Sequence, residues 1–250
     1  MKKTITLLVV AMLSLPIVAQ SCGNGMADGP AYGGHSGGVA VYIDNYVDLT
    51  RNSLNYASAQ GQSQMLFSSW SNTATVETHT QSYTIANVNF DVANATFVQK
   101  KEDNRFMGFT MGSSVKRVTI NGRSFKSVFS IADGKTKVYE VIHEDGSYAI
   151  LKNYEVKVRE RKMDSYTGRQ EQKITLSSDY YLQKSNNDAV VAFKMNKKSL
   201  LKLYAEEGIS AESIKNFAKE NRLSFKKDQD IKRILRFSSN LKNSALAMKN

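Results

Sequence analysis

The middle of the chain, from about residue 73 to residue 195, consists of short runs in which apolar and polar residues alternate. An alternation with a period of two is typical of strands with one buried face, and these runs are rich in β-branched and aromatic residues. They fall at residues 83–90, 96–98, 106–111, 115–120, 125–131, 137–142, 148–158, 174–183 and 189–194. The pattern predicts an antiparallel β domain of about eight or more strands.

Turn signals separate several of these runs. Asn121-Gly122 and Asp133-Gly134 each lie between two strand-length runs, and both dipeptides suit a tight hairpin turn that requires positive φ angles. A third turn is expected at residues 144–146. Together these signals predict a four-stranded antiparallel meander over residues 115–158.

The C-terminal part of the chain changes to a helical pattern. A first helix is expected over residues 199–207, ending at Gly208. Ser210 is placed to cap a second helix that runs to about Asn221, with Ile209 and Ile214 packing across its first turn.

A third helix is expected after Ser224, which is placed as its N-cap. Its apolar stripe comprises Ile231, Ile234 and Leu235. Asp228 and Asp230 lie near its positive N-terminal end, so they are interpreted as partners of the helix dipole rather than as calcium ligands.

The first twenty-one residues have the pattern of an export signal. Lys2 and Lys3 precede an apolar run over residues 5–18, and small residues follow. Because Ser14 and Pro16 interrupt this short run, it is not interpreted as a membrane-spanning helix. The sequence therefore predicts an exported protein, located in the periplasm, at the outer membrane as a lipoprotein, or outside the cell.

Two processing routes remain open at the end of this segment. Cleavage after Ala19 would leave Gln20 as the first residue, whereas Ser21-Cys22 supplies the small residue and cysteine that a lipoprotein signal requires. Cys22 is the only cysteine, and lipidation would explain an unpaired thiol in an oxidising compartment. Cys22 is accordingly the lipidation candidate, and a lone thiol in a disordered N-terminus is the other interpretation.

Residues 22–45 are expected to form a flexible linker, because residues 23–41 contain seven glycines. His35 within it is interpreted as solvated rather than as a metal ligand. The expected organisation is a signal peptide at 1–21, this linker, a β domain at 46–195, and a basic helical tail at 196–250 packed on the β domain. Hydrophobic residues make up 41% of the chain, as in globular proteins.

Positive charge is concentrated in the helical tail. Residues 194–250 hold fourteen Lys and Arg against six Asp and Glu, while the whole chain carries +11. Such a surface suits an acidic protein or an anionic component of the cell envelope, and the expected export makes nucleic acid an unfavoured partner. The partner-binding candidates, which are expected to cover the solvent face of the third helix, are Lys226, Lys227, Lys232, Arg233 and Arg236.

Candidate catalytic residues are few. His143, Glu144 and Asp145 form one acidic and histidine cluster, but adjacent residues in a strand or turn point in different directions, and acidic residues before glycine are good turn formers. His79 is expected on the solvent face of a strand. We find no nucleophile elbow, no paired-cysteine site and no phosphate-binding loop. The sequence therefore assigns no catalytic residue, cofactor or metal, and a non-enzymatic protein is expected.

Aromatic residues allow two interpretations. Trp70 is expected in a core or over one end of the sheet, and the functional alternative is an exposed platform for a sugar or peptide. The phenylalanines of the β region could line a cavity for an apolar ligand or could simply fill the core. The residues concerned are Phe67, Phe90, Phe97, Phe106, Phe109, Phe125 and Phe129.

Three segments carry a resemblance to a known group of proteins: residues 83–91 (YTIANVNFD), residues 179–184 (DYYLQK), and residues 221–227 (NRLSFKK) ahead of Asp230-Ile231. In these segments the chain resembles uncharacterised exported β-rich proteins of Gram-negative bacteria that have a helical C-terminal tail. The resemblance implies an exported location and a β-then-helix layout, and it implies no activity.

The expected fold is mainly β with an α tail: an antiparallel β-sandwich or open barrel followed by about three short helices. The expected function is that of an exported, non-enzymatic envelope protein that acts as a binding or structural module through its basic helical tail. The alternative is a carrier that holds an apolar or lipid ligand in a half-open barrel. A hydrolase of envelope polymers is less favoured because no motif supports it.

Overall fold

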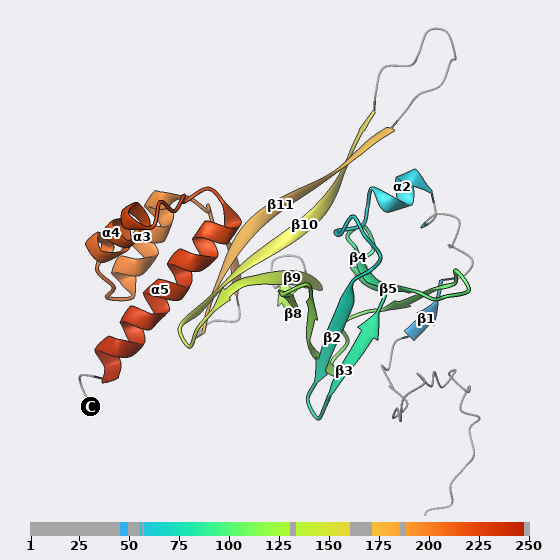
Figure 1. Ribbon diagram of the computed structural model, residues 1–250, viewed down its shortest axis with the longest axis horizontal. Helices are drawn as coiled ribbons and strands as arrows, with labels where there is room; N and C mark the ends of the chain where they lie inside the picture. The colour runs from blue at the N-terminus through green and yellow to red at the C-terminus, as the bar shows by residue number, and fades with distance from the viewer. Residues whose placement is uncertain are drawn as a thin grey trace, which may run out of the picture. The chain divides into compact units, whose positions relative to one another are not determined.

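A computed structural model of the chain describes residues 46–49, 56, 58–130, 134–160, 172–185 and 189–247 (Figure 1). In this part of the chain two antiparallel sheets are followed by three helices near the C-terminus, and neither sheet closes into a barrel. The predicted mainly β fold with an α tail is therefore confirmed. The expected signal peptide at 1–21, the linker at 22–45, His35 and Cys22 lie outside the described residues.

The larger sheet has eight strands in the order β12-β11-β10-β9-β8-β7-β2-β3. Their bounds are β2 (Thr73–Thr78), β3 (Ser82–Ala86), β7 (Val115–Ile120), β8 (Arg123–Ser130), β9 (Lys135–Glu144), β10 (Tyr148–Glu160), β11 (Gln172–Lys184) and β12 (Val190–Ala192). The consecutive strands β7 to β10 form the predicted meander. Asn121 and Gly122 join β7 to β8 with φ angles of 50° and 72°, as the hairpin prediction requires.

The smaller sheet has four strands in the order β1-β6-β5-β4, with β1 (Tyr46–Asp48), β4 (Val88–Asp91), β5 (Thr96–Lys100) and β6 (Phe106–Phe109). A short helix, α2 (Ala59–Gln62), precedes β2. The chain passes from one sheet to the other at Asn87, whose φ of 58° is in the left-handed region that asparagine tolerates. The prediction of one strand over residues 83–90 was therefore wrong, because β3 and β4 belong to different sheets.

Apolar side chains of the smaller sheet pack against β2, β3, β7 and β8 of the larger sheet. Phe97 of β5 lies at the centre of this core, with its ring centroid 4.8 Å from Phe90, 5.3 Å from Phe109 and 5.7 Å from Phe125. Large buried aromatic rings in contact with one another fill a core rather than line a space. Trp70 lies half-buried at the edge of a satellite cluster, 5.3 Å from the ring of Phe106.

Three C-terminal helices follow the sheets: α3 (Lys197–Glu206), α4 (Ala211–Glu220) and α5 (Asp228–Ala247). The Ser210 side chain accepts a hydrogen bond from the Ser213 N–H and caps α4, as predicted. The capping prediction for Ser224 was wrong: α5 begins four residues later, and the Ser224 Oγ instead accepts from the Lys226 N–H in the preceding turn.

The helices pack on the β9–β10–β11 end of the eight-stranded sheet through a second core. Its buried members are Ile142, Tyr148, Ile150, Leu200, Leu203, Tyr204, Ile209, Ile214, Ala218, Ile231, Ile234 and Leu235. Ile209 and Ile214 are both buried there, in agreement with the predicted packing across the first turn of α4. No helix in the described part of the chain is both long and apolar enough to cross a membrane.

Candidate functional site

Helix α5 has a polar side that is directed at the sheet. Asp228, Lys232, Ser239 and Lys242 are spaced by four, seven and three residues, which places them along one side of an α-helix. Each of the four bonds to a residue outside α5. We call this row the inner polar stripe of α5. It determines which side of the helix is left to face solvent.

Glu140 of β9 is the most buried partner of the inner polar stripe, with 3% of its side chain exposed. Its Oε2 accepts hydrogen bonds from Arg123 Nη2 at 2.8 Å and from the Tyr154 hydroxyl at 2.6 Å, and its Oε1 accepts from Lys232 Nζ at 3.1 Å. Burial raises the pKa of Glu140, but the Arg123 and Tyr154 hydrogen bonds outweigh it and leave the pKa below its usual value. Glu140 is therefore an ionised carboxylate held by two cations.

A second ion pair anchors the first turn of α5. Lys152 Nζ of β10 lies 2.5 Å from Asp228 Oδ2, and the Tyr180 hydroxyl of β11 donates to Asp228 Oδ1. Burial raises the pKa of Asp228, whereas the bonds from Lys152 and Tyr180 lower it, and the net pKa is below the ordinary value. The carboxylate also lies in the first turn of the helix, where the dipole favours negative charge.

A β-bulge directs two neighbouring residues of β9 at the helices. Leu151 pairs with Val141 and Ile150 pairs with His143, so Ile142 is an extra residue on β9. Ile142 consequently packs in the helical core, and His143 reaches Ser239 of α5 from the same side of the sheet. Without the bulge, strict alternation would place these adjacent side chains on opposite faces.

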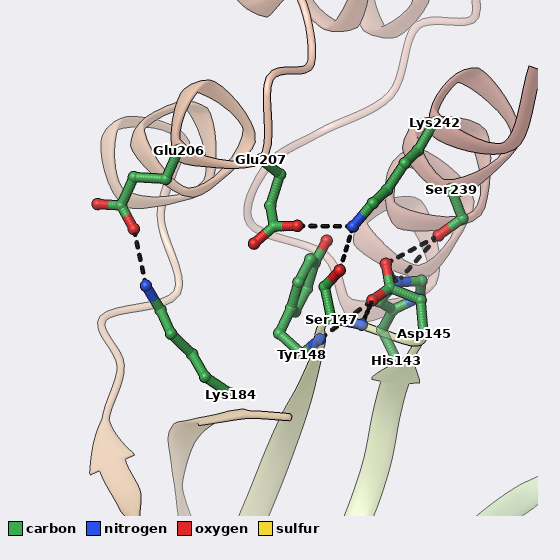
Figure 2. A network of polar contacts seen from close by, with 9 residues as sticks. All are labelled: His143, Asp145, Ser147, Tyr148, Lys184, Glu206, Glu207, Ser239 and Lys242. Carbon is green, nitrogen blue, oxygen red and sulfur yellow. Dashed lines mark hydrogen bonds and ion pairs between the residues drawn. The ribbon is translucent and has the colours of Figure 1, made fainter. Parts of the chain in front are cut away.

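His143, Asp145 and Ser239 meet at the end of the β9–β10 hairpin (Figure 2). Ser239 Oγ lies 3.1 Å from His143 Nε2, and Asp145 Oδ2 lies 3.4 Å from the same nitrogen. A catalytic triad needs the serine and the carboxylate on opposite ring nitrogens, so that the carboxylate orients the ring that activates the serine. Because both groups here approach Nε2, this cluster lacks the geometry of a catalytic relay and instead connects α5 to the hairpin.

Asp145 also stabilises the hairpin itself. Its Oδ1 accepts from the backbone N–H groups of Ser147 at 2.8 Å and Tyr148 at 3.1 Å. Burial raises the pKa of Asp145, but these two bonds and His143 lower it below its usual value. Burial lowers the pKa of His143, and Asp145 offsets only part of that change. The neutral form of His143 is therefore favoured in the native protein.

Lys242 is the C-terminal residue of the inner polar stripe. Figure 2 shows its Nζ between Glu207, at 2.6 Å, and the Ser147 hydroxyl, to which it also donates. The same view shows a more exposed pair, in which Lys184 at the end of β11 lies 3.2 Å from Glu206 of α3. Lys242 thus joins α5 to the end of α3 and to the β9–β10 hairpin.

The three residues of the suspected acidic and histidine cluster do not form one site. Glu144 pairs with Arg117 at 2.6 Å and with Lys126 at 2.5 Å, and neither partner contacts the His143 cluster. His143 and Asp145 do meet, which the argument from adjacent side chains did not anticipate. His79 lies near the surface, with Nε2 3.1 Å from the Ser113 carbonyl. Among the described residues, no group of three or more His, Cys, Asp or Glu is placed to hold a metal ion.

The outer side of α5 and the turn before it carry four of the five predicted partner-binding residues. Lys226, Lys227, Arg233 and Arg236 are exposed, and none of them has an acidic partner within the described part of the chain. Lys232 differs from them because it lies on the inner polar stripe and pairs with Glu140. We call Lys226, Lys227, Arg233 and Arg236, together with the exposed Arg222, the basic surface.

Sequence reasoning missed most of the partners of the inner polar stripe. One signal was present: Glu140 alternates in phase with Val138 and Ile142, two apolar residues of the same strand. A carboxylate that alternates with the apolar residues of a strand is expected to point toward the core. Such a carboxylate predicts a buried cationic partner, since an unpaired buried charge is very costly. The identity of that partner had no local signal, because Lys232 lies 92 residues away.

Comparison with known proteins found no matching family model, no matching curated protein and no matching solved structure.

Proposed function

We propose that this chain is an exported, non-enzymatic binding module that holds an acidic protein partner on its basic surface. One observation carries the proposal. Lys226 and Lys227 before α5, and Arg233 and Arg236 on it, lie exposed without an acidic partner in the described residues, while Asp228, Lys232 and Lys242 form ion pairs on the side of α5 that faces the sheet. Unpaired cations on one side of a fixed helix are available to a partner.

The inner polar stripe supports this proposal because it fixes the orientation of α5. Three ion pairs and the apolar core hold the helix at its first turn, at Lys232 and at Lys242. The exposed arginines are therefore presented from a rigid element, which reduces the entropy that ordering them on binding would cost. Arginine also binds carboxylates with two parallel hydrogen bonds, which favours it at protein interfaces.

The distribution of exposed apolar residues favours a protein partner over insertion into a lipid surface. A helix that lies in a membrane interface needs an exposed apolar face beside its cations. The apolar faces of α3, α4 and α5 are directed into the helical core. The large apolar side chains that are exposed in the described residues lie on strands instead: Phe129, Val158 and Val191.

The export part of the proposal rests on the sequence. The leader pattern at residues 1–21 and the resemblance to exported Gram-negative proteins both support it, and Cys22 supplies a candidate tether. A carrier function receives less support, because four of the seven phenylalanines proposed to line a cavity, Phe90, Phe97, Phe109 and Phe125, pack against one another.

The test begins with the protein in its own host. The chain is cross-linked in the native envelope, the captured partner is identified and purified, and its affinity is measured for two double variants. Arg233→Glu with Arg236→Glu reverses two charges on the basic surface. Lys116→Glu with Lys135→Glu makes the same change in net charge at exposed positions on the eight-stranded sheet.

We expect the helix variant to bind about 100-fold more weakly than the natural chain and the sheet variant to bind within about threefold of it. The affinity of the natural chain is also expected to fall with salt. Equal losses for the two variants, or a partner whose binding does not respond to salt, would contradict the proposal.

A further inference from the structure

Among the described strands, none pairs with most of the outer edge of β11. Its inner edge pairs with β10 over the full length from Gln172 to Lys184, but β12 covers only Tyr181 to Gln183 on the outer edge. Figure 1 shows β10 and β11 continuing together beyond β9. Within the described residues, no strand pairs with the outer edge of β11 between Gln172 and Asp179.

The backbone of β11 shows which residues offer hydrogen bonds at this edge. The Tyr180 carbonyl accepts from the Phe193 N–H, so the polar groups of Tyr180 face outward, away from β10. Backbone groups alternate in direction along a strand. Ile174, Leu176 and Ser178 therefore direct their N–H and C=O groups outward, where no described strand receives them.

The features that usually protect an edge strand are scarce here. Edge strands commonly carry proline, a bulge or several charged residues that prevent pairing with another chain. Between Gln172 and Asp179 there is no proline, the pairing with β10 has no register shift, and the charged residues are Lys173 and Asp179. Both of these side chains are exposed.

Lys173 also lies in an unfavourable position within its own sheet. It pairs in register with Arg159 of β10, so two exposed cations lie directly opposite each other. Like charges directly opposite on antiparallel strands are destabilising. A carboxylate brought to Lys173 by another chain would relieve this repulsion.

We propose that the free edge of β11 pairs antiparallel with β11 of a second copy of this chain, about a two-fold axis at Leu176. In this register Lys173 of each copy lies opposite Asp179 of the other, and Ile174 lies opposite Ser178. The outward backbone groups of Ile174, Leu176 and Ser178 all receive partners. The two eight-stranded sheets then continue into each other.

Charge complementarity selects this register among the symmetric alternatives. A two-fold axis at Thr175 would place Lys173 opposite Ser177, which carries no charge. An axis at Ser177 would place Ile174 opposite Tyr180, whose outward carbonyl already accepts a hydrogen bond from the Phe193 N–H. Only the axis at Leu176 forms two Lys173–Asp179 pairs, and its pairing extends from Lys173 to Asp179 of each copy and stops short of Tyr180. Isologous pairing of this kind is the usual geometry of a homodimer.

The test uses reversed charges and mixing. The natural chain is purified from its host in detergent, and its dimerisation constant is measured by sedimentation equilibrium over a range of concentrations. Lys173→Glu leaves two carboxylates facing each other in the proposed dimer, and Asp179→Lys leaves two cations. Each variant alone is expected to dimerise about tenfold more weakly than the natural chain.

Mixing the two variants is the decisive step. In a mixed dimer the carboxylate introduced at position 173 of one chain lies opposite the lysine introduced at position 179 of the other, and the natural Asp179 lies opposite the natural Lys173. The mixture is therefore expected to regain dimerisation close to that of the natural chain, and this recovery also shows that both variants are folded. A chain that stays monomeric at every concentration would overturn the proposal, and so would a dimer unaffected by the variants or a mixture that stays as weak as its components.

Discussion

Lys232 of α5 donates a hydrogen bond to Glu140 of β9 over 3.1 Å and so connects residues that are 92 positions apart in the chain. This bond adds a helix contact to a carboxylate that already receives Arg123 and Tyr154 from the neighbouring strands. The stability of the sheet and the orientation of α5 consequently depend on the same buried group. The basic surface, on the other side of α5, is presented through that orientation.

The loss of unfolding free energy on replacing Glu140 should be larger than the loss on replacing a carboxylate of a surface ion pair. We expect Glu140→Gln to lower the free energy of unfolding by about 3 kcal/mol, because it leaves Arg123 and Lys232 without their anion. Glu144→Gln removes the two more exposed pairs with Arg117 and Lys126 and should cost at most about 1 kcal/mol. Urea denaturation measures both variants, and similar losses for the two would show that Glu140 has no special role.

Two tyrosines that differ in the hydrogen bonding of their hydroxyls provide a second test. The Tyr154 hydroxyl donates to Glu140, so Tyr154→Phe should cost about 1.5–3 kcal/mol of unfolding free energy. The Tyr204 hydroxyl is buried and has no hydrogen-bond partner among the described residues, so Tyr204→Phe should change stability by less than about 0.5 kcal/mol. Chemical denaturation of the matched pair would contradict this account if Tyr204→Phe were the more harmful change.

The pH dependence of stability should report on His143. Its pKa is lowered from 6.5 in the folded protein, chiefly by burial, so the unfolded chain takes up a proton at a higher pH than the native protein does. Stability is therefore complete above pH 6.5 and falls as the pH drops below that value toward the native pKa. The Asp145 pKa is also lowered, but its contribution is lost only below pH 3.8.

His143→Gln should remove most of the dependence between pH 7.5 and pH 5 while retaining a polar group near Ser239. Denaturation midpoints of the natural chain and the variant at several pH values provide the measurement. A variant that loses as much stability as the natural chain over this interval would show that another group is responsible.

Arg222 ends α4 in a conformation that usually belongs to glycine. Its φ is 52°, and the Leu223 N–H returns to the Ala218 carbonyl at 2.8 Å, as in a helix that ends with a left-handed residue. Arg222→Gly should raise the free energy of unfolding by about 0.5–1 kcal/mol, because it removes this backbone strain. Arg222→Ala is the control for lost charge and should give no such gain, and thermal unfolding of both variants decides the point.

Sequence reasoning succeeded where the signal was local. The Asn121-Gly122 turn needed only two residues with positive φ, and the Ser210 cap needed only a hydroxyl ahead of an amphipathic segment. The division of β3 from β4 at Asn87 was missed: the apolar positions change phase there, from Tyr83 and Ile85 to Val88 and Phe90, but a change of phase does not show that the two halves join different sheets. Which sheet each strand joins is determined by distant residues, such as Asn72, which bonds to the backbone of Val88.

The candidate site could be predicted only in part for the same reason. Arg233 and Arg236 follow from the helical periodicity of α5, whereas Lys226 and Lys227 lie in the turn before it rather than on the helix predicted from Ser224. Lys232 could not be separated from them, because its inward direction depends on Glu140. The approach of His143 to Ser239 depends on a bulge at Ile142 that the β9 sequence does not signal.

The most direct test of the proposed binding surface is site-specific photo-cross-linking in the native host. A photoreactive residue at Asn240, an exposed position one turn beyond Arg236, leaves every cation of the basic surface in place, and the same residue at Lys116 serves as the matched position on the sheet. The account predicts that an acidic protein is captured from position 240 and not from position 116. Capture from position 116 alone, or the same capture from both positions, would contradict it.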